Sequence, residues 1–296
     1  MILVSAAAGN QGRLLVPKLL AAGVEVRASV RSQTSADRLL AAGVAEVVVG
    51  DLADPDVQRR AVAGVEALYH VGATLSPGER AMGLGVVEAA RREGVRHVVL
   101  SSVLHSIVTD LVQHEIKRDV EEALLAADLE FTILQPSNYM LPLKLRPAFE
   151  RSVFELSWSL ERRQSLVDLD DVTDVAVMAL LDPGRHAGAT YELVAPGRFT
   201  AYELAGVIAQ VLGRDIAVRQ IDANTYARAW LGDRDSADAA HELSVLRSIS
   251  ARYSAHDFVG NPNVLTWLLG REPRSFADFV AREWAATGAT TAGAPA

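Results

Sequence analysis

The stretch MILVSAAAGNQGRLLVPKLL, residues 1–20, runs from an apolar strand through a turn of small residues into an apolar-periodic helix. Such a turn points backbone N–H groups and the positive end of the helix dipole at one place, which suits a pyrophosphate. Gly9 and Gly12 let the backbone approach a ligand closely, because neither has a Cβ. Alanine stands at positions 6 and 7, where a dinucleotide fingerprint has its first glycine, so an ordinary α/β crossover is the alternative. The residues predicted to contact the pyrophosphate are Ala7, Gly9, Asn10, Gln11 and Gly12.

Composition and charge exclude several functions. The 296 residues include no cysteine, which excludes disulfides, thiolate nucleophiles and cysteine-ligated metals. The formal net charge of −8 argues against a nucleic-acid surface, because phosphate binding needs clustered Lys and Arg. The seven histidines have no metal-binding spacing, so no metal site is expected. The chain opens on a core strand and has no apolar run of about 18 residues. We therefore expect a cytoplasmic protein with no signal peptide and no membrane segment.

Strand-like and helix-like runs alternate through residues 1–140, which is typical of an α/β fold with a doubly wound parallel sheet. Asp54 followed by Pro55 is a helix start signal, since Asp caps a helix and Pro fits its first position. Strands are predicted at residues 1–5, 24–30, 45–49, 67–71, 97–100 and 131–134. Helices are predicted at residues 13–20, 35–42, 55–63, 78–93 and 114–127. We predict a dinucleotide-binding domain over residues 1–140.

The alternation breaks in the second half of the chain. Residues 141–296 are predicted to form a smaller, mostly helical lobe that bears the substrate cleft. Residues 165–181 have the pattern of a further strand and helix that return to the first domain, with Asp170 or Asp171 as the helix cap. The small and polar residues 286–296 are expected to be a disordered tail.

The end of the second predicted strand, about 20 residues after the glycine turn, is where an acidic residue binds the ribose of NAD(H). This chain has Arg31 there, and no Asp or Glu in residues 30–34. A guanidinium pairs with a 2′-phosphate, so NADP(H) is favoured over NAD(H); a solvated loop charge is the alternative. Asp51 could accept a hydrogen bond from adenine or cap the next turn. Further contacts to the cofactor are predicted at strand ends that converge on the same edge: Asp51, Leu52, Val71, Gly72, Ala73 and Ser101.

Several motifs in register resemble the NmrA-like group of atypical short-chain dehydrogenases/reductases. They are AAAGNQG (6–12), GDL (50–52), SSVLHS (101–106), HEIK (114–117) with VEE (120–122), and LQPSNYM (134–140). The resemblance implies a Rossmann domain that binds NADP(H), with a smaller lobe closing a cleft over the nicotinamide. It also places Pro136, Ser137 and Asn138 at the cofactor. The group includes reductases, quinone-active enzymes and proteins that bind the dinucleotide to report redox state.

Ordinary short-chain reductases use a Tyr-x-x-x-Lys pair, in which the lysine ammonium lowers the pKa of the tyrosine that delivers the proton. Here Lys117 occupies the lysine place, but Gln113 stands four residues before it, and glutamine cannot act as a general acid. The proton donor must be another group, and the candidates are His114, His105 and Tyr139.

The sequence allows two interpretations of the role of Lys117. By resemblance to isoflavone-reductase-like enzymes it would hold the nicotinamide ribose hydroxyls and assist as the acid. Alternatively, Lys117 pairs with Glu121, and Arg118 with Glu122, in ordinary i,i+4 surface bridges. His70 lies inside an apolar strand and is expected to be a buried or cleft-lining histidine with a satisfied hydrogen bond.

Two functions follow, from different classes. The first is an NADP(H)-dependent oxidoreductase that reduces a small apolar carbonyl, quinone or enone by hydride transfer. The second is a redox sensor that binds NADP(H) and acts through a protein partner without turnover, which the missing tyrosine favours. Reuse of the fold for a non-redox function is a third alternative. The protein could also form a homodimer. The substrate cleft is expected to be walled by Tyr139, Met140, Leu141, Phe154 and Trp158.

Overall fold

The computed structural model describes residues 1–231 and 237–288. The chain divides into two compact units, the first made of residues 1–136 and 169–193 and the second of residues 137–168 and 194–296. The predicted tail from residue 286 is helical at its first residue, and its part from 289 onward lies outside the described residues.

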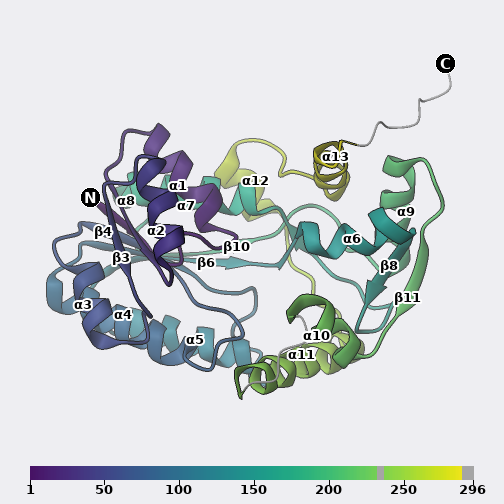
Figure 1. Ribbon diagram of the computed structural model, residues 1–296, viewed down its shortest axis with the longest axis horizontal. Coiled ribbons are helices and arrows are strands. Elements are labelled where there is room, and N and C mark those ends of the chain that lie inside the picture. The colour runs from purple at the N-terminus through teal and green to yellow at the C-terminus, as the bar shows by residue number, and fades with distance from the viewer. Residues whose placement is uncertain (232–236, 289–296) are drawn as a thin grey trace. The chain divides into compact units, whose positions relative to one another are not determined.

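The first unit is built on a seven-stranded parallel sheet in the order β10-β6-β5-β4-β1-β2-β3 (Figure 1). Its strands are β1 (Ile2–Val4), β2 (Val26–Val30), β3 (Glu46–Val49), β4 (Ala67–Val71), β5 (His97–Ser101), β6 (Glu130–Pro136) and β10 (Ala189–Leu193). The order reverses between β1 and β4, which is the switch point where doubly wound sheets bind ligands at their carboxyl edge. The α/β prediction is confirmed.

Helices cover both faces of this sheet. They are α1 (Gly12–Ala21), α2 (Gln33–Ala41), α3 (Pro55–Val62), α4 (Glu79–Glu93), α5 (Val112–Leu125), α7 (Leu169–Leu181) and the short α8 (Pro183–His186). Figure 1 shows α3, α4 and α5 side by side along one face, with α1, α2 and α7 on the other. The central strands are apolar on both faces, as helices on both sides require, and Leu3 and Leu68 are fully buried between them.

The return of the chain to the sheet differs from the prediction in two ways. Helix α7 begins at Leu169, so Asp170 and Asp171 lie in its first turn and neither is the residue before it. Asp170 instead lies 3.3 Å from Lys18 of α1, whose Nζ also lies 2.6 Å from Asp174 Oδ1, and these ion pairs fasten α7 to α1. Residues 189–193, inside the range expected for the lobe, pair with β6 as the edge strand of the main sheet.

The second unit combines two small parallel pairs with helices. The pairs are β7 (Asn138–Tyr139) with β9 (Leu166–Val167), and β8 (Val153–Leu156) with β11 (Ala217–Gln220). The helices are α6 (Pro142–Arg151), α9 (Ala201–Leu212), α10 (Ala223–Leu231), α11 (Ala237–Ala255), α12 (Asn263–Leu269) and α13 (Phe276–Ala286). Trp158 lies in its core, with edge-to-face contacts to Tyr226 and Tyr253 at centroid distances of 5.9 and 5.4 Å.

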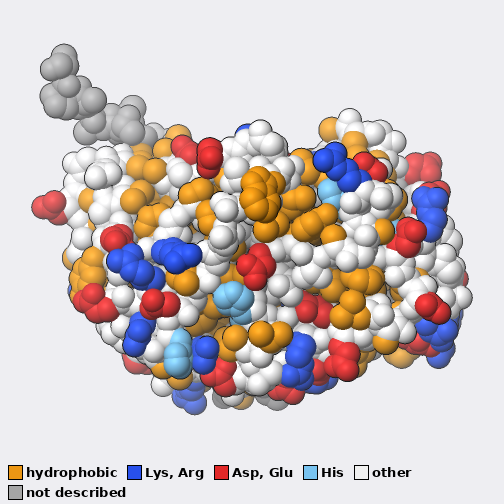
Figure 2. Space-filling view, turned by 180° about the vertical axis from the view of Figure 1, so that it is seen from behind, with side chains coloured by type: hydrophobic (Ala, Val, Ile, Leu, Met, Phe, Trp, Pro, Cys, Tyr) orange, Lys and Arg blue, Asp and Glu red, His pale blue; other side chains and the backbone are white. Residues whose placement is uncertain are grey.

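The surface carries both signs of charge. On the face shown in Figure 2, acidic and basic side chains are interspersed among neutral and hydrophobic ones. Within the described part of the chain, no helix has both the length and the apolar character needed to cross a membrane.

The start of α3 offers a test of the local rules. The Asp54 side chain accepts a hydrogen bond from the Asp56 backbone N–H at 2.8 Å, and Pro55 occupies the first helical position. We expect Asp54→Ala to lower the free energy of unfolding by about 1 kcal/mol, because a helix N–H loses its partner. Chemical denaturation would measure the change. Asp56→Ala, at an exposed position, is the matched control, and an equal loss there would contradict the assignment of Asp54 as the cap.

Candidate functional site

The turn between β1 and α1 is shaped by contacts that exclude side chains. A Cβ on Gly12 would lie 2.4 Å from the carbonyl oxygen of Ala7 and 2.5 Å from its Cα, so the helix can reach the strand only at a glycine. The Gly9 N–H donates to the Ala6 carbonyl at 2.8 Å, which closes the turn. Gln11, the residue before α1, makes no side-chain cap to the helix. This leaves the helix N-terminus open to an anion.

Ala6 explains the missing first glycine. Its φ is +47°, in the left-handed region that glycine adopts without cost. The chain therefore keeps the backbone conformation of the fingerprint at position 6 and carries the strain of an alanine there.

Gln11 has a role that the sequence did not indicate. Its side chain is 4% exposed; its Oε1 accepts from the Tyr69 hydroxyl, and its Nε2 donates to Ser101 Oγ at 3.0 Å. The amide thus ties the turn to the middle of β4 and the end of β5. Both Gln11 and Ser101 were predicted cofactor contacts, and the structure commits their side chains to each other. Tyr69, fully buried, was missed because its pattern is that of an ordinary core residue.

The adenosine side of the edge contains Arg31 and Asp51. Arg31 follows β2 and is exposed, and no hydrogen bond or ion pair of its guanidinium is found within the described residues. Asp51 Oδ1 accepts from the Ala53 N–H at 2.9 Å, which is the turn-capping alternative. Leu52 packs its side chain into the core, so its predicted contact with the cofactor would be made by its backbone. A guanidinium with no protein partner is suited to an anionic ligand group.

Lys117 does not form the predicted bridge along its own helix. Its Nζ lies 2.8 Å from Glu79 Oε1 on α4, and the two side chains are only 9% and 3% exposed. It also donates to the Ser101 carbonyl at 3.5 Å. Arg118 pairs with Asp119 at 2.9 Å and not with Glu122. Both i,i+4 bridges are therefore corrected, because α4 packs closely enough on α5 to supply another carboxylate.

Glu121, the expected partner of Lys117, organises the loop after β5 instead. Its carboxylate accepts hydrogen bonds from Ser102, from Ser106 at 2.8 Å and from Gln135 Nε2 at 3.0 Å. These contacts hold the segment that carries His105. His105 has a φ of +56°, so this loop turns through a left-handed residue there.

The histidines have distinct hydrogen-bonding states. His114 is 1% exposed, and its Nδ1 lies 2.9 Å from the carbonyl of His105, so Nδ1 carries a proton. In the neutral ring the other nitrogen is then an acceptor, and His114 can donate from it only when charged. His105 is partly exposed, with Nε2 3.8 Å from Glu192. His70 is buried with Nδ1 3.2 Å from Ser5 Oγ, as expected; burial and then the charge of Lys117 lower its pKa to about 3.

Gln113 is a buried residue near the start of α5. The residue is 8% exposed, and its Oε1 has no hydrogen-bond partner within the described part of the chain. It lies one helical turn before Lys117, on the same face of α5. A buried amide oxygen without a partner is costly, and a ligand hydroxyl would satisfy it.

The remaining predicted residues divide between the two units. Val71 ends β4, Gly72 and Ala73 follow it, and Pro136 ends β6, all in the first unit. Ser137, Asn138 and Tyr139 belong to the second unit. The Asn138 amide donates to Gln164 Oε1 at 2.5 Å and accepts from the Tyr253 hydroxyl at 3.4 Å. Ser137 Oγ is buried without a partner among the described residues.

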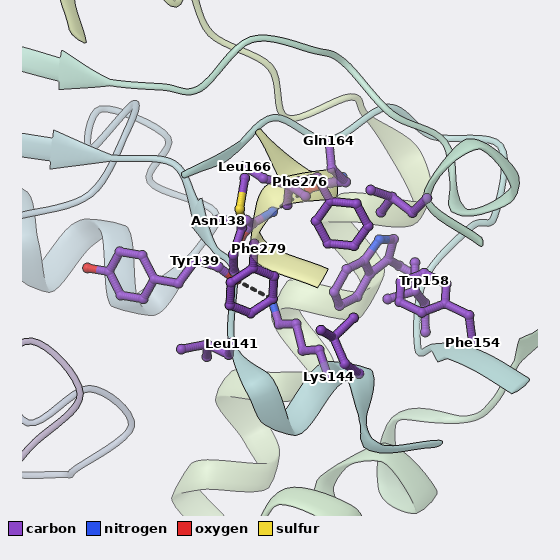
Figure 3. A pocket seen from close by; sticks show the side chains of 14 residues that line it. Asn138, Tyr139, Leu141, Lys144, Phe154, Trp158, Gln164, Leu166, Phe276 and Phe279 are labelled. Carbon is purple, nitrogen blue, oxygen red and sulfur yellow. Dashed lines mark hydrogen bonds between the residues drawn. The ribbon is translucent and has the colours of Figure 1, made fainter. Parts of the chain in front are cut away.

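The second unit contains an apolar pocket, drawn in Figure 3. Its walls include residues predicted for the substrate cleft: Tyr139, Met140, Leu141, Phe154 and Trp158. Phe276 and Phe279 of α13 and the side chain of Lys144 complete it, and these were not anticipated. Figure 3 shows the Tyr139 ring directed away from the other aromatic rings.

Lys144 is the basic side chain of this pocket. Its Nζ donates to the Tyr139 carbonyl at 3.3 Å, the dashed line of Figure 3. Burial lowers its pKa to about 8, because an ammonium loses hydration among apolar side chains.

Among the described residues, no group of three or more His, Cys, Asp or Glu could hold a metal ion.

Known proteins are similar to this chain in sequence. A model of the NmrA-like family matches residues 1–257. The chain is 30% identical to an NAD(P)H azoreductase of Xenophilus azovorans, over 98% of this chain and 100% of the relative. It is 24% identical to quinone oxidoreductase 2 of Escherichia coli, over 77% and 80% of the two chains.

Solved structures share the fold. The NADPH-dependent quinone oxidoreductase of Escherichia coli complexed with NADPH has a TM-score of 0.78 at 22% identity, covering 95% of this chain and 99% of that one. NmrA, a negative transcriptional regulator, in complex with NADP has a TM-score of 0.77 at 17% identity, covering 97% of both chains.

The strained turn residue gives a prediction. Ala6→Gly removes the Cβ that disfavours a positive φ, and we expect it to raise the free energy of unfolding by about 1 kcal/mol. Thermal or urea denaturation measures this. The matched control is Ala8→Gly, two residues along, whose φ is not positive and which is expected to gain nothing. No gain at position 6 would contradict the account of the alanine as a strained substitute for glycine.

Proposed function

The chain belongs to the NmrA-like family, and we propose that it is an NADP(H)-dependent oxidoreductase that reduces a small apolar carbonyl, quinone or enone. The observation that carries the proposal is the carboxyl edge of the sheet. Three features meet the ends of different strands around the β1/β4 switch point. The glycine turn follows β1, Arg31 follows β2, and the buried Lys117 faces the end of β5.

The residues at this edge fit a dinucleotide. The backbone around Gly12 leaves no room for a side chain, and the open N-terminus of α1 suits a pyrophosphate. Arg31 supports NADP(H) over NAD(H), because its guanidinium would pair with the 2′-phosphate. The NAD(P)H azoreductase relative and the NADPH complex of the quinone oxidoreductase favour the same cofactor.

The absence of a tyrosine four residues before Lys117 favours one class of substrate over the others. When bound, NADPH supplies a hydride, and the reduced substrate then needs a proton. Lys117 would hold the ribose hydroxyls, and the unpaired Gln113 Oε1 would accept a hydrogen bond from a hydroxyl of the cofactor or of the reduced product without giving up a proton. A reduced quinone is a phenolate, whose conjugate acid has an ordinary pKa of about 10, so water or a lysine can protonate it. An alkoxide from a simple aldehyde is far more basic and gains more from a dedicated acid, so the site favours quinones.

The second candidate is a redox sensor that binds NADP(H) without turnover. Gln113 in the tyrosine place supports it, as does the shared fold with a transcriptional regulator bound to NADP. The two candidates differ in turnover and agree on the cofactor.

A turnover assay separates them. We expect NADPH oxidation with a panel of quinones to be faster than with aldehydes, followed by nicotinamide absorbance. Lys117→Ala is expected to lower kcat/KM for the quinone by about a hundredfold or more, since it removes a group that orients the cofactor. Lys144→Ala is a control on a lysine of the second unit, expected to affect the KM for substrate more than that for NADPH. Tight NADPH binding with no oxidation across the panel would favour the sensor.

Cofactor choice is tested separately at Arg31. Arg31→Ala is expected to weaken NADPH binding by about tenfold to a hundredfold and to leave NADH binding unchanged, because one charge-assisted contact to phosphate is lost. Calorimetric titration of both dinucleotides measures it. Arg38→Ala, an exposed arginine on the following helix, is the matched control. Equal affinity of the parent protein for NADPH and NADH would overturn the role of Arg31.

A further inference from the structure

Glu79 and Lys117 form a buried ion pair between two helices. Glu79 is the first residue of α4 and Lys117 lies in α5, with Oε1 and Nζ 2.8 Å apart. Nζ also approaches the carbonyl of Ser101, at the carboxyl end of β5. The pair therefore lies at the same edge of the sheet as the glycine turn, beside the strand end where the cofactor is proposed to bind.

Gly72 is the third member of this arrangement. A Cβ at this position would lie 2.6 Å from Glu79 Oε1 and 2.8 Å from Lys117 Nζ. Its φ is not in the left-handed range, so its conformation does not require glycine. The space that glycine leaves at the end of β4 is filled by the charged ends of Glu79 and Lys117, and any side chain there would push them apart.

Glu79 is the group that neutralises Lys117, because the other charged groups nearby have partners of their own. Within the described residues, Glu79 is the carboxylate in ion-pair contact with Lys117. On α5, Glu121 is bound by Ser102, Ser106 and Gln135, and Glu115 and Asp119 pair with Arg80 of α4. On the neighbouring strand and loop, His70 is held neutral by burial, while His105 faces Glu192 and His114 bonds the backbone. A buried ammonium without a carboxylate partner would be strongly unfavourable.

We propose that Glu79 is a positioning residue, which acts with Gly72 to hold the charged end of Lys117 at the cofactor. In a short-chain reductase the lysine is paired in function with a tyrosine on its own helix. Here the tyrosine place holds Gln113, and Lys117 is oriented from the adjacent helix instead. The inference rests on the proposed binding of NADP(H) at this edge, and Glu79 itself, 3% exposed, acts through Lys117 without touching the substrate.

The test uses the full-length protein, NADPH and a quinone substrate. Glu79→Gln keeps the shape and removes the charge, whereas Glu79→Asp keeps the charge on a shorter stem. Glu79→Gln is expected to raise the dissociation constant for NADPH. It is also expected to lower kcat/KM for NADPH by about a hundredfold, because Lys117 would be displaced. Glu79→Asp is expected to recover part of both losses. Gly72→Ala retains both charged groups and is expected to reproduce the defect by separating them. Glu88→Gln, an exposed carboxylate on the same helix, is the matched control and should match the parent.

The readouts separate positioning from support of the fold. We expect the primary isotope effect with 4-deuterated NADPH to change in Glu79→Gln, because the cofactor is held differently during hydride transfer. A merely structural glutamate would reduce the amount of folded protein and leave the KM for NADPH and the isotope effect at parent values. That result overturns the proposal. If Glu79→Gln does not fold, Glu79→Asp decides by the same measurements.

Failure of the wider proposal has its own signature. A parent protein that binds no NADPH overturns the proposed function and this inference together. A parent that binds NADPH without turnover overturns the reductase alone, and the dissociation constants of the Glu79 variants still decide the inference. Parent-like affinity in a folded Glu79→Gln variant would then overturn it.

Discussion

The close approach of α1 to β1 is the contact on which the arrangement of the first unit depends. Gly12 meets the backbone of Ala7 at a distance that no Cβ would permit, so the helix begins directly above the strand end. That placement opens the helix N-terminus toward the β1/β4 switch point. Gln11 then connects this turn to Tyr69 and Ser101, which fixes the turn against β4 and the end of β5.

Polar groups buried at the same edge are matched to one another with few exceptions. Lys117 has Glu79, and Glu121 has two serines and a glutamine. Such pairing is required because unmatched charges and hydrogen-bonding groups are costly away from water. The amide oxygen of Gln113 is an exception that the structure leaves unpaired among the described residues. This unsatisfied acceptor lies one helical turn from Lys117 in α5, and in the proposed function a ligand would supply its hydrogen bond.

The groups near Lys117 have a limited capacity to donate a proton. Gln113 cannot supply a proton, and the Nδ1–H of His114 donates a hydrogen bond to the carbonyl of His105. This is why the proposed function favours acceptors whose reduced form is weakly basic. In the proposed function, cofactor binding and orientation depend on the backbone turn and on two cations, Arg31 and Lys117, which come from different parts of the chain.

Patterns local in the chain were sufficient for much of this structure. The alternation of strands and helices, the Asp54 cap and the position of Arg31 after β2 could all be read from the sequence, because each depends on residues close to it in the chain. The partner of Lys117 could not. The i,i+4 rule selects Glu121, and the choice of Glu79 depends on how closely α4 packs on α5 and on the space left by Gly72. Likewise, the β10 pairing and the pocket around Lys144 arise where distant segments meet. The sequence by itself determined the fold class and the dinucleotide-type turn, and only the tertiary structure decided which buried charges neutralise each other, because that depends on distances between helices that no local pattern encodes.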